Sequence, residues 1–171
     1  CHEHVTYPAL SQINYLAKSA NLRLVNVELN AVNGGSILVV GCRDDSDIIP
    51  SHTLVEQILI QEAPLNDLKP FGLFQSRIKD HRTEVLEFFA EQKRKGKLVI
   101  GYGASTKGNI VLNYCDLGPE DLVAICDANE EKIGRVTPGS NIPIISKREM
   151  RERNPDYLFV LIWHFHKEVL E

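Results

Sequence analysis

The sequence predicts an α/β protein in which a helix and an antiparallel pair of strands precede a parallel sheet flanked by helices. Three observations predict this class. Residues 97–112 show a short apolar run, a glycine-rich turn and then an amphipathic helical pattern. Further apolar runs alternate with helical patterns after that segment, as the crossovers of a parallel sheet require. Two strand patterns joined by a glycine turn come before it.

The N-terminal part is predicted to hold one helix and two strands. Apolar residues at helical spacing place the helix between Tyr7 and Ala20. Residues 22–29 alternate between apolar and polar side chains, as a half-buried strand does, and residues 37–42 form the second strand. The turn signal Asn33-Gly34-Gly35-Ser36 lies between them, so the two strands are predicted to pair antiparallel.

The middle of the chain is predicted to be helical. A short helix covers 54–62 and ends at the break Ala63-Pro64-Leu65. A long helix runs from Pro70 to about Lys95, just before Gly96. Its apolar side is predicted to hold Phe74, Ile78, Val85, Phe88 and Phe89. We place a domain boundary before this helix, with residues 1–70 in one domain and 71–171 in the other.

The second domain is predicted to be a series of parallel strands with helices between them. The predicted strands cover residues 98–100, 122–126, 142–145 and 157–162. The predicted helices are 107–116 and a short one that Ser146 caps. The last strand is almost entirely apolar, as a strand buried on both faces would be. Right-handed crossovers between such strands give a Rossmann-like sheet.

Composition and charge exclude several classes of function. The net charge of −4 argues against a nucleic-acid binder, which usually has a basic surplus on one face. No apolar run approaches the ~20 residues that span a membrane, so no membrane partner is expected. The four cysteines form no C-x-x-C pair, which favours reduced thiols in a cytoplasmic protein over a zinc site.

The glycine-rich segment after the first parallel strand is the strongest candidate for a binding site. Thr106 stands where a dinucleotide fingerprint has glycine, and Asn109 where a P-loop has lysine, so neither motif is complete. The strand–turn–helix can still present backbone N–H groups to a phosphate. Ser105 or Thr106 can cap the helix, and Lys107 adds positive charge. The predicted binding residues are Gly101, Gly103, Ala104, Ser105, Lys107 and Gly108.

That segment has one alternative interpretation, a tight turn that binds nothing. We favour the anion site. Glycine is expected there because a side chain would keep the backbone away from a ligand.

Two more candidates follow later strands, since ligands of open α/β sheets bind at the carboxyl ends of strands. Asp127 comes about 20 residues after the glycine-rich turn, as a ribose-binding carboxylate does. It can equally form the turn of residues 127–130. Trp163 follows the last strand, where it can stack on a base or a sugar, or anchor the core. Both choices stay open from the sequence alone.

The segment Cys1-His2-Glu3-His4 is the other cluster of chemically active side chains. In an extended segment His2 and His4 lie on one face, but a third metal ligand at useful spacing is missing. Histidine also titrates near neutral pH, which suits general acid–base catalysis. Taken alone, this cluster is best interpreted as a polar segment.

Several motifs occur in a fixed order along the chain. They are Cys1-His2-Glu3-His4, Asn33-Gly34-Gly35-Ser36, Gly101–Gly108, Asp127 with Lys132 and Gly134, Pro138-Gly139 before Ile142-Pro143-Ile144, and Trp163-x-Phe165-x-x-Glu168. In that order they resemble the S-adenosylmethionine-dependent sugar C-methyltransferases, which act on nucleotide-linked deoxysugars. The resemblance covers essentially the whole chain.

The resemblance implies a protein of three parts. These are a small zinc-binding N-terminal domain, a methyltransferase domain and a Rossmann-like C-terminal domain. Residues 1–70 would then end the methyltransferase domain, so that their helix and strand pair complete its sheet. Residues 71–171 would form the C-terminal domain. The zinc cysteines and the loop that binds S-adenosylmethionine would lie upstream. We therefore expect a fragment whose partners are its own N-terminal domains.

The implied reaction methylates a carbon next to the ketone of a 4-keto sugar nucleotide. A base removes the α-proton, and the resulting enolate carbon attacks the sulfonium methyl group. Glu3 and His4 match the last two positions of the family's Tyr-x-Glu-His motif, and Cys1 stands at the tyrosine position. The implied catalytic residues are His4 as the base, Glu3 to orient the sugar, and His2 beside them. The 101–108 loop would serve the nucleotide-diphosphate sugar.

Two other functions are weighed against this transferase. One is an NAD(P)-binding module of an oxidoreductase, which the missing glycine at Thr106 disfavours. The other is a non-catalytic nucleotide-sensing domain, which the retained His2, Glu3 and His4 disfavour. The leading hypothesis is the nucleotide-sugar-binding and partly catalytic portion of a C-methyltransferase, and we expect this portion alone to be inactive.

Overall fold

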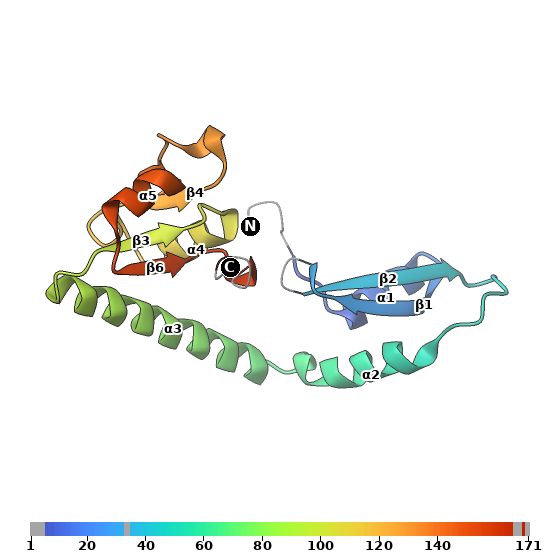
Figure 1. The fold of residues 1–171 in the computed structure, drawn as a ribbon. Coiled ribbons are helices and arrows are strands. Elements are labelled where there is room, and N and C mark those ends of the chain that lie inside the picture. Colours follow the sequence, from blue (N-terminus) through green and yellow to red (C-terminus); the bar gives the residue numbers. More distant parts are fainter. Residues whose placement is uncertain (1–5, 33–34, 166–168, 170–171) are drawn as a thin grey trace. The chain divides into compact units, whose positions relative to one another are not determined.

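The structure is a computed structural model of the chain and describes residues 6–32, 35–165 and 169, with the backbone alone at 52 and 53. By its internal contacts the chain divides into two units, one ending at Gln75 and the other beginning at Ser76. The division falls inside a long helix (Figure 1). The domain boundary at residue 70 stays a prediction.

In the N-terminal unit, two helices pack on a two-stranded sheet (Figure 1). The elements are α1 (Leu10–Ser19), β1 (Leu22–Asn30), β2 (Ser36–Arg43) and α2 (His52–Glu62). The predicted antiparallel pairing is confirmed, and its register runs from Leu22 opposite Arg43 to Asn30 opposite Ser36. The core of this unit consists of Leu10, Leu24, Val27, Val55 and Ile58.

The start of α1 is capped from a distance. Its N-cap residue is Ala9, which has no side-chain oxygen to accept a hydrogen bond. Glu62, at the end of α2, accepts hydrogen bonds from the N–H groups of Leu10 at 2.7 Å and Ser11 at 2.8 Å. A carboxylate at a helix N-terminus also interacts favourably with the helix dipole. This contact therefore fixes α1 against α2.

A 26-residue helix, α3 (Lys69–Arg94), follows the 3-10 turn η2 (Ala63–Asn66). The predicted long helix is confirmed, but its predicted apolar side is buried only in part. Val85 and Phe89 are buried, whereas Phe74 is 55% exposed. None of the described helices, this one included, is long and apolar enough to cross a membrane.

The C-terminal unit is built on a four-stranded sheet whose strands are all parallel, as predicted. Its strands are β3 (Val99–Tyr102), β4 (Ile125–Asp127), β5 (Ile144–Ser146) and β6 (Tyr157–Val160). Their order in the sheet is β5-β4-β3-β6, and Figure 1 shows β3 between β4 and β6. Along the chain, β4 pairs with β3 and β5 pairs with β4, and β6 then pairs with the other side of β3. This is the strand order of a Rossmann-like half.

Helices cover both faces of this sheet. Because successive strand residues point to opposite faces, each strand contributes to two cores. The face covered by α3 and α4 (Thr106–Tyr114) uses Val99, Ile125 and Ile144. The face covered by α5 (Lys147–Arg153) uses their neighbours Ile100, Cys126 and Ile145. The sheet edge where the strands end stays open to carry a site.

Two predicted strands begin two or more residues too early. Residues 122–124 precede β4 because the N–H of Leu122 bonds back to the Gly118 carbonyl, in a turn. Ile142 precedes β5 because it pairs with Thr137 instead. The N–H of Thr137 donates to the Ile142 carbonyl, and the N–H of Ile142 donates to the Thr137 hydroxyl. The apolar character of Leu122 and Ile142 reflects their burial in the core and not membership of a strand.

The third correction concerns β6. It ends at Val160, two residues earlier than predicted, and lies at the edge of the sheet. Tyr157 and Leu158 are 42% and 41% exposed, so the prediction of a strand buried on both faces is wrong. Edge strands pair on one side only, and an apolar sequence does not reveal that position.

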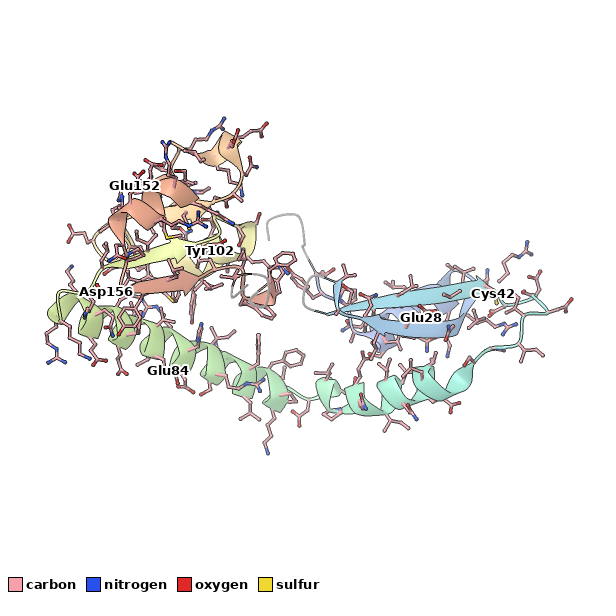
Figure 2. All side chains as sticks on the ribbon, viewed as in Figure 1. Glu28, Cys42, Glu84, Tyr102, Glu152 and Asp156 are labelled. Atoms are coloured by element: carbon pink, nitrogen blue, oxygen red, sulfur yellow. The ribbon has the colours of Figure 1, made fainter. Side chains whose placement is uncertain are left out.

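The start of β6 is held by a carboxylate. Asp156, marked in Figure 2, accepts hydrogen bonds from Lys97 Nζ and from the N–H of Leu98, each at 2.8 Å. The hydrogen bond from Lys97, followed by that from Leu98, lowers the pKa of the Asp156 carboxyl from its ordinary value of 3.8. The contact ties β6 to the segment that leads into β3.

Asp156→Asn is therefore expected to lower the free energy of unfolding near neutral pH. A carboxyl whose pKa is lower when folded stabilises the fold above its ordinary pKa, and this contribution is lost as pH falls through the folded value. Urea titrations at pH 7 and below pH 3 should show a difference between wild type and variant that shrinks in acid. Glu87→Gln, at an exposed position of α3, is the control. A difference that does not change with pH would contradict this role.

Candidate functional site

A cavity of about 340 Å³ opens at the carboxyl ends of the parallel strands. We call it the carboxyl-edge cavity. Ligand pockets occupy about 300–1,000 Å³ and favour this edge of an open α/β sheet, so its size and place are those of a binding site. It is lined by Tyr102, Gly103, Ser105, Cys126, Asp127, Ala128, Lys132, Lys147, Ile162, Phe165 and Val169.

Lys147 supplies a cationic centre in this cavity. It is the first residue of α5 and is half-buried. Its Nζ lies 5.3 Å from the centre of the Tyr102 ring, a cation–π distance. Figure 2 marks Tyr102 at the end of β3. Within the described part of the chain no carboxylate lies within ion-pair distance of Lys147, so its charge is available to an anionic ligand.

A second lysine is fixed by a hydrogen-bonded network. Lys132 Nζ donates to the Ala104 carbonyl at 2.9 Å and to Asp127 Oδ2 at 3.3 Å. The same Oδ2 accepts the N–H of Ala104 at 2.8 Å. Asp127 Oδ1 accepts the N–H of Asn129 at 2.8 Å, which makes the turn after β4. Asp127 therefore forms the turn and also binds the glycine-rich loop.

This network bears on the prediction that backbone N–H groups of the loop bind a phosphate. The N–H of Ala104 was predicted to face a ligand, but it donates to the protein's own carboxylate. A carboxylate can satisfy a backbone N–H as a phosphate does. Contact of Asp127 with a ribose stays a prediction.

Two glycines of the loop are required by packing. Gly103 has φ +88°, and a Cβ there would lie 2.6 Å from Ile162 Cγ2. A Cβ on Gly108 would lie 2.8 Å from Leu161 Cβ. These two positions therefore require glycine because the segment that follows β6 packs closely against them. The reason expected from the sequence was instead close approach of a ligand.

The helix cap at the loop is settled. Of the two candidates, Ser105 is the cap of α4, and its Oγ accepts the N–H of Gly108 at 2.9 Å. Ser105 also lines the carboxyl-edge cavity, whereas Lys107 is exposed and does not line it. Gly101 lies within β3 against the side chain of Ile125.

Trp163 is not among the described residues that line the cavity. Trp163 begins the 3-10 turn η4 (Trp163–Phe165) and is 58% exposed, while Phe165 lines the cavity. The predicted catalytic residues His2, Glu3 and His4 lie outside the described residues. Their roles stay predictions.

Tyr102, Cys126 and Lys147 are among the lining residues that sequence reasoning missed. Tyr102 and Cys126 occupy matching positions on neighbouring strands, because Tyr102 pairs with Cys126 in the register of β3 and β4. Strand alternation could have placed them together had the strand ends been known. Lys147 directly follows Ser146, the predicted cap that the structure confirms. Its position after a strand end was the available signal.

Cys126 is not a nucleophile in this cavity. Burial raises the pKa of its thiol to about 11, so it stays protonated at neutral pH, and a thiol is a poor nucleophile and metal ligand. Among the described residues, no group of three or more histidine, cysteine or acidic side chains could hold a metal ion.

Comparison with known proteins points to one family. The family described as the C-methyltransferase C-terminal domain matches residues 31–171. The C-methyltransferase NovU of Streptomyces niveus is 32% identical to this chain over an alignment of 177 residues. The alignment covers 99% of this chain. The chain spans 41% of the length of that relative.

Asp127→Ala is expected to loosen the glycine-rich loop. The change leaves the N–H of Ala104 and the ammonium of Lys132 without their shared acceptor, at a cost of roughly 1–3 kcal/mol in the free energy of unfolding. Urea titration measures this loss, and hydrogen exchange at Ala104 should become faster. The control is Glu131→Ala, at an exposed position of the neighbouring turn. Unchanged exchange at Ala104 would show that Asp127 does not hold the loop.

Proposed function

The chain belongs to the C-methyltransferases through their C-terminal domain, and on that premise we propose that it binds the nucleotide-linked sugar of an S-adenosylmethionine-dependent sugar C-methyltransferase. The substrate proposed is a 4-keto deoxysugar on a nucleoside diphosphate. One observation carries the proposal, the half-buried Lys147 that faces the carboxyl-edge cavity without a carboxylate partner in the described part.

The cavity has the chemistry that a nucleoside diphosphate needs. Lys147 and Lys132 offer ammonium groups to the phosphates, which form strong charge-assisted hydrogen bonds. Tyr102 and Phe165 offer aromatic surface against which a base or sugar can pack. Asp127 already uses both carboxylate oxygens within the protein, so its main effect is to hold Lys132 in place.

The same cavity does not suit the methyl donor. S-adenosylmethionine carries positive charge on its sulfonium and amino groups, and two lysines would repel it. We therefore assign the donor site to the upstream methyltransferase domain. We assign the zinc site, which the resemblance implies, to the N-terminal domain. The donor supplies the methyl group from its sulfonium.

The acid–base groups are proposed to come from the start of the chain. His4 accepts the proton from the carbon next to the ketone, and Glu3 orients the sugar, with His2 beside them. An imidazole has the pKa range that such a base requires.

Calorimetry on the 171-residue chain tests the binding proposal. Deoxythymidine diphosphate glucose is the probe, with NAD and S-adenosylmethionine as comparisons. Heat from the nucleotide sugar alone supports the proposal. Heat from NAD would favour the oxidoreductase module instead, and no heat from any of the three would contradict a nucleotide-sugar site in this part.

Lys147→Gln is expected to weaken binding of deoxythymidine diphosphate glucose by about tenfold or more, since a charged hydrogen bond to phosphate is lost. The matched control is Arg148→Gln, one residue further along α5, where the side chain is exposed and lines no part of the cavity. Equal affinities for wild type and the Lys147 variant would remove Lys147 from the proposed site.

The chain alone is expected to produce no methylated sugar when mixed with S-adenosylmethionine and a 4-keto sugar nucleotide. The reason is that the described cavity does not fit the donor. Mass spectrometry of the sugar nucleotide measures the outcome. Turnover above that of a heat-denatured sample would place a donor site within these 171 residues.

A further inference from the structure

A second cavity, of about 270 Å³, lies between the first turn of α4 and the segment 132–138. We call it the α4 cavity. It is lined by Ala104, Thr106, Asn109, Lys132, Arg135, Val136, Thr137, Pro138 and Ile144. Lys132 is the one described residue that also lines the carboxyl-edge cavity.

The α4 cavity is cationic. Its described lining contains Lys132 and Arg135 and no acidic side chain. Asp127 holds the ammonium of Lys132, but that carboxylate lines the other cavity. Arg135 is exposed and makes no ion pair with any described residue. An anion entering this cavity therefore meets an uncompensated guanidinium.

The segment that carries Arg135 is held in place before any ligand binds. The N–H of Gly134 donates to the Ile144 carbonyl at 2.9 Å, and the N–H of Ile144 donates to the Arg135 carbonyl at 2.8 Å. These two bonds attach the segment to β5. A binding group on a fixed backbone loses less conformational entropy when it engages a ligand.

The other lining residues define the shape of the ligand. Thr106 offers a hydroxyl at the first residue of α4, where the helix dipole also favours an anion. The lining also has an apolar part, to which Val136, Pro138 and Ile144 belong. The volume lies just below the range of about 300–1,000 Å³ that is usual for ligand pockets, so only a small ligand fits.

We propose that the α4 cavity binds a small phosphate monoester of the size of a sugar phosphate, separately from the nucleotide sugar. A phosphate monoester is a dianion at neutral pH and matches two cations better than a carboxylate does. The guanidinium fork of Arg135 can engage two of its oxygens. The sugar packs on the apolar part of the lining. This site does not depend on the ligand proposed for the carboxyl-edge cavity.

Glucose 1-phosphate is the probe, titrated calorimetrically into the 171-residue chain and its variants. Arg135→Gln is expected to weaken its binding by about tenfold or more, and Arg135→Lys by less. Lys147→Gln, in the other cavity, is expected to leave the affinity unchanged, as is the exposed Arg148→Gln. Thermal unfolding of each variant checks the fold, and the exposure of Arg135 predicts an unchanged midpoint. Inorganic phosphate should bind more weakly, because it does not reach the apolar part of the lining.

Each result has a definite meaning. Loss with Arg135→Gln and retention with Lys147→Gln support the proposal, whether or not deoxythymidine diphosphate glucose binds elsewhere. Loss with Lys147→Gln, alone or together with Arg135→Gln, would place the phosphate in the carboxyl-edge cavity and overturn it. Absence of binding to the wild type would also overturn it. Equal affinity for inorganic phosphate would contradict a monoester as the occupant.

Discussion

The carboxylate of Asp127 is the group on which both cavities depend. At the end of β4 it binds the N–H of Ala104 and the ammonium of Lys132, and so ties the glycine-rich loop to the neighbouring strand. The loop then ends at Ser105, which starts α4 by capping its first turn. One acidic side chain thereby fixes a turn, a helix start and a lysine. A shorter polar residue could form the turn, but it would not carry the charge that holds Lys132.

Local charge, not net charge, decides what these cavities attract. The chain carries a net charge of −4, yet each cavity is lined by two cationic side chains, and Asp127 is the one acid in the described lining of either. At physiological ionic strength the Debye length is about 8 Å, so exposed acids elsewhere are largely screened at either cavity. The composition predicts no nucleic-acid surface, but it could not indicate two cavities whose linings contain cationic side chains.

The errors in the strand predictions share one cause. Leu122 and Ile142 are apolar and buried, yet the N–H of Leu122 bonds to Gly118 in a turn and Ile142 pairs with Thr137 rather than with a strand of the sheet. Tyr157 and Leu158 are apolar but lie on an edge strand. Hydrophobic patterns report which side chains leave water, whereas strand bounds depend on which partner each backbone group finds. For the same reason Lys147 could not be assigned to a site, because its approach to Tyr102 is a contact between elements far apart in the chain.

The sequence by itself determined the class of fold, the antiparallel pair β1–β2, the long helix, and the cap Ser146. It also carried the order of motifs that marks the family. Each of these depends on residues a few positions apart or on motifs that are visible in the sequence. Only the tertiary structure decided that Glu62 caps α1 from 51 residues away, that Asp127 accepts the N–H of Ala104, and that Lys132 lines two cavities. A polar group in the sequence shows that it needs a partner, but the partner is chosen by the packing that brings distant elements together.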